Sequence, residues 1–148
     1  MRHGWLRFRR NERGAALLEV ALTMPLMLFI AIGIVEFGRA YQTWQVLTNA
    51  AREGARIAVL PGTDDASVTS RVRTYMTDGQ LDQAATAAVI ITRNNPLAIG
   101  AGTTTASRVT VDYPFTFIVL QPIARMVVSN STVGAPLTMT ASALMRNE

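Results

Sequence analysis

The sequence predicts an α+β protein, in which a long N-terminal transmembrane helix continues into a small domain with a second helix and a three- to four-stranded antiparallel sheet. Three observations predict this fold. The run from Ala15 to Val35 carries one charged residue and is roughly 30 Å long as a helix, the thickness of a bilayer core. Apolar residues at helical spacing then continue to Leu60 without a helix breaker. Alternation with a period of two follows at residues 108–117 and 136–146, as in strands with one buried face.

The charge distribution separates a short leader from the rest of the chain. Of the 148 residues, 14 are basic and 10 are acidic, and the whole excess of +4 lies in residues 1–14. A basic segment in front of an apolar helix stays in the cytoplasm under the positive-inside rule. We therefore expect a cytoplasmic leader at 1–14, a single membrane span and a C-terminal domain on the other side of the membrane. The same distribution argues against nucleic-acid binding, which needs a basic surface on the folded domain.

The residue types argue against catalysis and against a metal site. The chain has no cysteine, and its one histidine, His3, lies in the leader. A histidine-based triad, a zinc site or a thiolate metal site is therefore hard to assemble in the folded part. The sequence predicts no catalytic residue, no metal ligand and no cofactor, and we expect the protein not to be an enzyme.

The long helix is expected to cover residues 15–60. Its first part would lie in lipid, and its second part, which is amphipathic from Glu36, would project from the membrane. Pro25 should kink or loosen the membrane part because it removes a backbone donor. Tyr41 and Trp44 follow the apolar run, where amphipathic aromatic side chains favour the headgroup layer. The alternative is a buried helix of a soluble core, although few soluble helices are apolar on every side.

The C-terminal domain is expected in residues 61–148. A second helix begins after the capping oxygen of Asp64 or its neighbours and closes at Gly79. Its expected apolar stripe consists of Val68, Val72, Tyr75 and Met76. Pro114 indicates an edge position or a bulge in its strand. The later elements are expected in this order: a strand at 87–93, a loop at 94–107, a strand at 108–117, a short helix at 118–128 broken near Pro122, and a last strand at 136–146.

The junction between leader and helix carries the functional signal. The leader ends in Gly14, and Glu19 is the fifth residue of the helix that begins at Ala15. An ordinary secretory signal is cut after its apolar segment, whereas a cut after Gly14 would remove the leader and keep the anchor. Such a cut would create a cationic amine at Ala15, which Glu19 of a neighbouring subunit could neutralise in lipid. Because two isolated charges in lipid are costly, this pairing would stabilise subunits whose helices pack in the correct register. A tolerated acid near the membrane interface is the alternative interpretation of Glu19.

The same junction resembles a known signal. Glycine, four residues and glutamate at Gly14 to Glu19 resemble the type IV prepilin signal. The stretch from Arg10 to Ala58, which includes NAAREGAR at 49–56, resembles the TadE-like family of pilin-like proteins, as does the ending ASALMRNE. The resemblance implies a pilin-like fold and a minor pilin or pseudopilin of the tight-adherence (Flp) pilus system. It also implies insertion in the bacterial inner membrane with a periplasmic C-terminal domain, and processing by a prepilin peptidase. Other pilin-like subunits and an inner-membrane assembly platform are the implied partners.

A row of small residues marks one face of the helix after the apolar run. Ala50, Gly54 and Ala58 lie four residues apart, and small residues at this spacing allow close approach of another helix or of a sheet. One interpretation is a packing interface with a partner pilin. The other is an alanine-rich helix that packs on its own domain.

Two further functions remain open from the sequence. The helix could serve only to anchor a periplasmic binding or sensing domain that has no pilus role, and Glu19→Ala would then leave function intact. Alternatively, a cut after the apolar run, near Ala31 to Gly33, would release a soluble domain.

Overall fold

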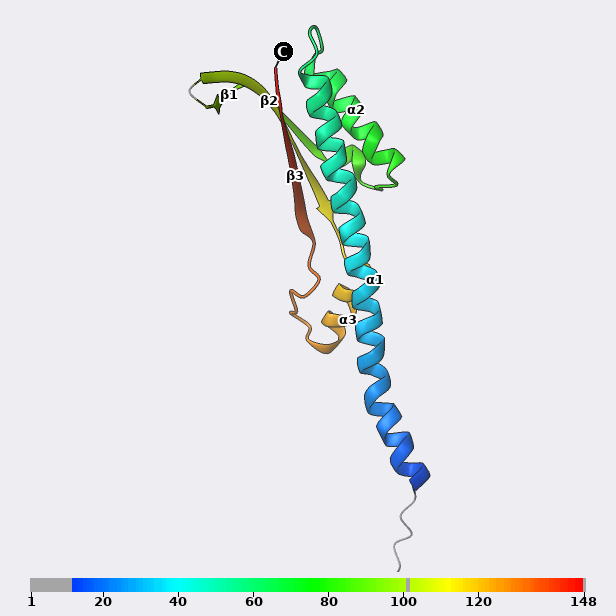
Figure 1. Cartoon of the computed structure of the whole chain (residues 1–148). Coiled ribbons are helices and arrows are strands. Elements are labelled where there is room, and N and C mark those ends of the chain that lie inside the picture. Colours follow the sequence, from blue (N-terminus) through cyan, green and yellow to red (C-terminus); the bar gives the residue numbers. More distant parts are fainter. Residues whose placement is uncertain (1–11, 101, 148) are drawn as a thin grey trace, which may run out of the picture. The chain divides into compact units, whose positions relative to one another are not determined.

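The structure is a computed structural model that describes residues 12–100 and 102–147, so the expectations for most of the leader lie outside the described residues. The chain forms two compact units, one that ends at Val35 and one from Glu36 to Glu148. The elements in chain order are α1 (Glu12–Ala58), α2 (Asp65–Asp78), the 3-10 turn η1 (Ala84–Thr86), β1 (Ala88–Ile99), β2 (Gly102–Phe115), α3 (Leu120–Val127) and β3 (Leu137–Arg146) (Figure 1).

Helix α1 confirms the long apolar helix predicted from the sequence. It has 47 residues, which corresponds to roughly 70 Å, and it remains one helix through Pro25. After Ala58 the chain turns at Gly62, whose φ of 79° lies in the left-handed region that a residue without a Cβ adopts readily. Helix α1 contributes to both compact units because its last residues, from Glu36 on, belong to the second unit.

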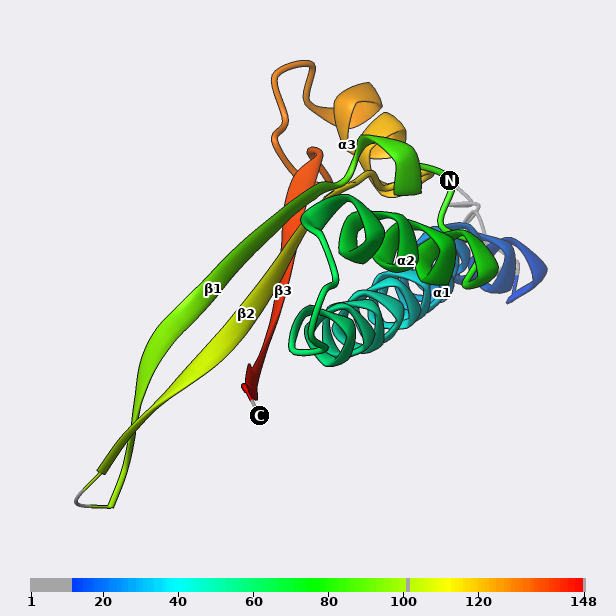
Figure 2. The same ribbon diagram turned by 90° about the horizontal axis from the view of Figure 1, so that it is seen from above.

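Helix α2 begins and ends at the predicted caps. The Asp64 side chain accepts a hydrogen bond from the Ser67 amide at 3.0 Å, and the Gly79 amide donates to the Tyr75 carbonyl at 3.0 Å. The predicted apolar stripe is only partly correct, because Tyr75 remains 36% exposed. The buried residues of α2 are Val68, Val72 and Met76. In the domain, α2 lies beside α1 on one face of the sheet (Figure 2).

The sheet has three antiparallel strands in the order β1-β2-β3, so β2 is central. The loop predicted for residues 94–107 is wrong, because β1 continues to Ile99 and β2 starts at Gly102. The register shifts between Thr92 and Asn95, and from Pro96 and Thr105 to the hairpin turn the two strands pair only with each other. Residues 96–99 and 102–105 form this two-stranded extension, which we call the hairpin arm (Figure 2). Pairing of the backbone stabilises the arm although its side chains lack an apolar pattern.

The core lies between the sheet and the two helices α1 and α2. The alternation predicted for residues 108–117 is confirmed, since every second residue of β2 from Val109 to Phe115 is buried. Leu47, Ala51 and Ala55 of α1 are fully buried against this face. Phe117 lies after the end of β2 and is only partly buried at the edge of the core.

Pro114 lies in the central strand, whereas the sequence suggested an edge position or a bulge. The pairing of β1 with β2 ends at Ala88 and Asp112, so at Pro114 the strand β2 is paired only with β3, opposite Thr138. Without a β1 residue beside it, the missing N–H of Pro114 breaks no ladder on that side. Locally, therefore, the central strand resembles an edge.

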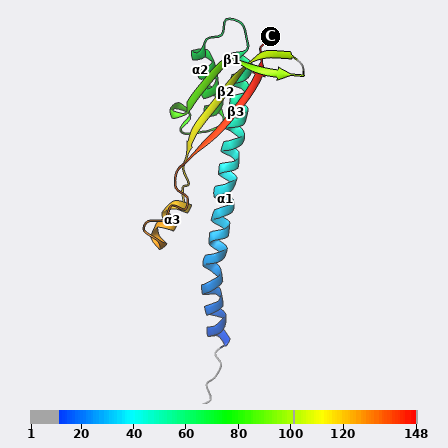
Figure 3. The ribbon, with the colours of Figure 1, turned by 90° about the vertical axis from the view of Figure 1, so that its left-hand side faces the viewer.

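Helix α3 is continuous, and the break expected near Pro122 does not occur. Pro122 lies in the first turn, where the amide has no intrahelical acceptor, so proline is tolerated. Helix α3 lies beyond the end of the sheet at which β2 ends and β3 begins (Figure 3). Ala124 is its one buried residue.

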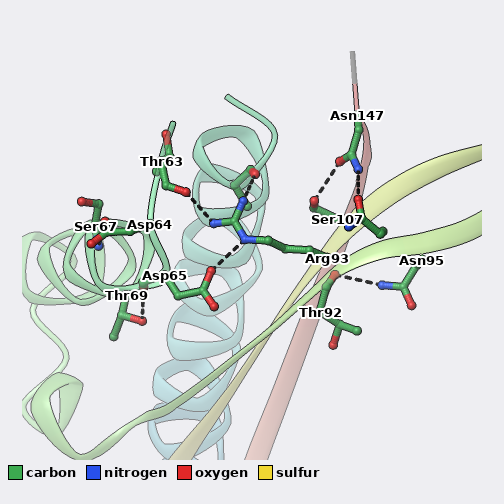
Figure 4. Close-up of polar contacts among 12 residues, drawn as sticks. Thr63, Asp64, Asp65, Ser67, Thr69, Thr92, Arg93, Asn95, Ser107 and Asn147 are labelled. Carbon is green, nitrogen blue, oxygen red and sulfur yellow. Dashed lines mark hydrogen bonds and ion pairs between the residues drawn. The ribbon is translucent and has the colours of Figure 1, made fainter. Parts of the chain in front are cut away.

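Arg93 on β1 connects the sheet to the α1–α2 turn. Its guanidinium donates to the carbonyl oxygens of Ala58 at 2.7 Å and Thr63 at 2.9 Å. It also pairs with the Asp65 carboxylate at 2.8 Å (Figure 4). One side chain thus satisfies a carbonyl at the C-terminus of α1 and fixes the start of α2.

Candidate functional site

The predicted processing site lies in the first turn of α1. Gly14 and Ala15 are helical and exposed. The first amides of a helix have no intrahelical acceptor, so little hydrogen bonding holds this turn closed. The bond between these two residues therefore lies in a turn whose amides no intrahelical acceptor holds.

Glu19 is exposed within the apolar run. Its backbone carbonyl accepts a hydrogen bond from the Thr23 hydroxyl at 2.9 Å. Among the side chains that the structure describes, none forms an ion pair with Glu19. Ala15 and Glu19 are separated by about one helical turn, so both fall on the same face of α1.

The apolar residues around Glu19 are exposed on every side of the helix. Leu22 is 70% exposed and Val35 is 71% exposed, which is far above what an apolar side chain in a soluble core shows. In the described part of the chain, α1 is the one helix that is long and apolar enough to cross a membrane, with a mean hydropathy of 2.3 in its most apolar window. Such a surface needs lipid or other apolar helices around it.

Residues 14–56 match the model of the family described as TadE-like protein. These residues are similar to that family, and we call them the TadE-like segment. The resemblance predicted from the sequence is thereby confirmed for the N-terminal region. No curated protein and no solved structure gives a significant match. The TadE-like segment contains Gly14, Glu19, Ala50 and Gly54, and it suggests involvement in the tight-adherence pilus system and anchoring in a membrane.

The small-residue face of the TadE-like segment packs on its own domain in the structure. Ala50 is fully buried, and Ala58 is 2% exposed. A Cβ at Gly54 would lie 2.5 Å from a methyl group of Val72 and 3.1 Å from one of Val109, so glycine permits α2 and the sheet to approach α1 together. Sheet and second helix cover this face, which leaves it no free surface for a partner subunit in this conformation.

Glu36, which sequence reasoning did not single out, is the buried charge of the domain. The residue is 2% exposed. Its carboxylate accepts a hydrogen bond from the Val119 amide at 2.6 Å and pairs with Arg39 at 3.1 Å. The available signal was its position as the first charge after the apolar run, with an arginine three residues later on the same helix face.

Arg39 extends this contact to the end of β2. Its guanidinium donates to the Thr116 carbonyl and lies 4.7 Å from the ring centroid of Phe115. The rings of Phe115 and Phe117 meet edge to face with centroids 5.2 Å apart, and Phe37 meets Phe117 at 6.5 Å. Glu36 and Arg39 of α1 therefore hold the segment between β2 and α3 in place.

A second charged cluster joins the TadE-like segment to α2. Glu53 pairs with Arg56 at 2.8 Å on α1 and with Arg71 at 3.0 Å on α2. Hydrogen bonds from Arg56 and from Arg71 outweigh the effect of burial and lower the pKa of Glu53 to about 2. Glu53, Arg56 and Arg71 thus form a three-residue cluster that joins α1 to α2.

The charged and polar side chains of the described residues make contacts that hold the domain together. No group of three or more histidine, cysteine, aspartate or glutamate side chains able to hold a metal ion gathers within 12–100 and 102–147. The buried polar side chains described there all have hydrogen-bond partners. The arrangement thus suits a membrane-anchored structural role built on α1.

Proposed function

We propose that this protein is a minor pilin-like (pseudopilin) component of the tight-adherence (Flp) pilus machinery. In this proposal, residues 15–35 span the bacterial inner membrane, and residues 61–148 form the periplasmic domain. The observation that carries the proposal is the exposed apolar surface of α1, inside a TadE-like match that begins at Gly14. The partners are a prepilin peptidase, other pilin-like subunits and an inner-membrane assembly platform, and the role is structural.

Processing would cut the bond between Gly14 and Ala15. The basic leader would then stay in the cytoplasm, whereas the apolar helix would remain in the membrane. The new α-amine of Ala15 is cationic at neutral pH. An uncompensated charge in lipid costs about 2.5–3.5 kcal/mol on insertion scales, so amine and carboxylate both gain from meeting.

Assembly would place that amine beside Glu19 of a neighbouring subunit. Helices that pack out of register would leave both charges in apolar surroundings, and this cost selects the correct register. The apolar residues on the other sides of α1 would contact lipid before assembly and neighbouring helices after it. Since the small-residue face is covered by the domain, subunit packing would use the exposed face of residues 15–35.

Mass spectrometry of the mature N-terminus tests processing. The protein is purified from membranes of cells that assemble the pilus, and we expect its chain to begin at Ala15. Gly14→Val should leave the leader attached, because a side chain at the cut site interferes with the peptidase. Gly33→Val is the matched control in the same helix and should be cut normally. Assembly-competent protein that still begins with Met1 would contradict the proposal.

The register role is tested separately with Glu19→Gln. We expect this variant to be processed and inserted but to fail in assembly, measured as recruitment into complexes with other pilin-like subunits. Asp78→Asn removes the same charge from the exposed end of α2 and should assemble normally. If Glu19→Gln assembles like the unmodified protein, the membrane-anchored binding or sensing domain becomes the better interpretation.

A further inference from the structure

The segment around α3 carries exposed apolar side chains that the domain does not cover. Met126 is 87% exposed and Val127 is 78% exposed. We call the following exposed residues the α3 patch: Ile118, Val119, Met126, Val127, Val128 and Val133. An eight-residue helix is not stable by itself in water, and several exposed apolar side chains within one short segment mark a contact site.

The α3 patch is held by Glu36, the residue that directly follows the apolar run in the sequence. Val35 is the last residue of that run, and Glu36 follows it directly. The Glu36 carboxylate binds the amide of Val119, which is itself a patch residue, at 2.6 Å. If residues 15–35 span the bilayer, this hydrogen bond keeps the start of α3 at the level of the bilayer boundary.

Charge around the patch favours an anionic lipid surface. The sequence holds no acidic residue between Asp112 and Glu148, and the exposed Arg125 lies in the last turn of α3. A short helix with apolar side chains and a basic residue is the composition of segments that lie in the headgroup layer. Phe37 and Tyr41 of α1, which are 65% and 62% exposed, add aromatic side chains that favour the same layer.

The loop after α3 packs against the start of this helix. Gly134 in the following loop has a φ of 71°, and a Cβ there would lie 2.8 Å from the backbone nitrogen of Gln121. The loop therefore packs directly on the first turn of α3. Together with the Glu36 contact, this packing holds the start of α3 in place.

We infer that the α3 patch docks on the membrane surface, with Met126 and Val127 in the boundary between headgroups and acyl chains and Arg125 at the lipid phosphates. This inference rests on the membrane span of the proposed function, and it adds a second contact between the domain and the bilayer. Two contacts orient a domain on a membrane, whereas a single helix leaves it free to tilt.

Site-directed spin labelling tests the inference, because the chain has no cysteine and every introduced one is unique. Full-length Met126→Cys and Val127→Cys proteins are labelled with a nitroxide in nanodiscs of phosphatidylethanolamine and phosphatidylglycerol. Collisions with oxygen, which concentrates in lipid, are compared with collisions with a water-soluble nickel chelate. Ile90→Cys on β1, at a residue 51% exposed, is the matched control, and Phe29→Cys reports on the membrane span.

We expect the ratio of oxygen to nickel accessibility to be several-fold higher at 126 and 127 than at 90, and to approach the ratio at 29. A water-like ratio at 126 and 127, with a lipid ratio at 29, would overturn the inference and leave the span intact. Immobilised labels shielded from both reagents would also overturn it, in favour of a protein partner. A water-like ratio at 29 would instead contradict the membrane span itself.

Discussion

The Nη1 of Arg93 lies 2.7 Å from the carbonyl oxygen of Ala58, the last residue of α1. The same guanidinium reaches Thr63 and Asp65, so three parts of the domain share one side chain. The strand β1 is thereby fastened to the point where the long helix ends and the second helix begins.

Arg93→Ala should destabilise the domain by about 2 kcal/mol, because two carbonyl oxygens lose a charged donor and Asp65 loses its ion pair. Chemical unfolding of the full-length protein in detergent micelles measures this change. Arg108→Ala, at an exposed position on β2, is the control and should change the unfolding free energy by less than about 0.5 kcal/mol. Equal effects of the two substitutions would contradict this account of Arg93.

Substitution of two glycines of α1 by alanine should change the free energy of unfolding in opposite directions. Gly54→Ala would place a Cβ 2.5 Å from a buried methyl of Val72, so we expect destabilisation by about 1–3 kcal/mol. Gly38→Ala meets nothing within 4 Å and should stabilise the helix by about 0.5–1 kcal/mol. The two variants serve as controls for each other in the same unfolding experiment. Stabilisation by Gly54→Ala would mean that the close approach does not exist.

Removal of the Glu36 side chain should loosen the segment that leads to α3. Glu36→Ala leaves the Val119 amide and Arg39 without their carboxylate, at a cost of about 2–3 kcal/mol. The Val119 amide should lose its protection against hydrogen exchange, whereas amides in the middle of β2 keep theirs. Glu36→Gln retains an oxygen acceptor and should protect this amide more than Glu36→Ala does. Undiminished protection in Glu36→Ala would contradict the contact.

The Glu53 cluster should make stability depend on pH in the acid range. The pKa of Glu53 is about 2 in the folded protein, against 4.5 for an ordinary glutamate. Because the folded pKa is lowered, the contribution is complete above pH 4.5 and is lost as the pH falls toward 2. Two partly exposed pairs contribute about 1 kcal/mol. Glu53→Gln should therefore unfold with a weaker pH dependence in this window, and an unchanged dependence would show that other groups cause it.

The helices and the inward residues of β2 could be predicted because their signals are local. Continuous apolar residues, a capping aspartate and a period of two are visible in short windows of sequence. The hairpin arm could not be predicted, since backbone pairing sustains it without an apolar pattern. Glu36 and Val119 are 83 residues apart, and Arg93 and Ala58 are 35 apart, so these pairs follow only from the folded chain. The candidate residues Gly14, Ala15 and Glu19 came from their spacing, which needs no tertiary contact.

The hairpin arm should tolerate amino-acid substitutions better than the rest of the domain. Its two strands pair only with each other, its one backbone contact outside the hairpin among the described residues is the Asn147 amide that donates to the Thr105 carbonyl, and it contributes none of the fully buried side chains. Substitutions there therefore leave the packing of α1, α2 and the buried residues of β2 unchanged. Mutational change can therefore accumulate in the arm at little cost to folding. For the same reason, a short epitope inserted beside Gly100 offers a way to follow the protein in cells without disturbing either its membrane helix or its core.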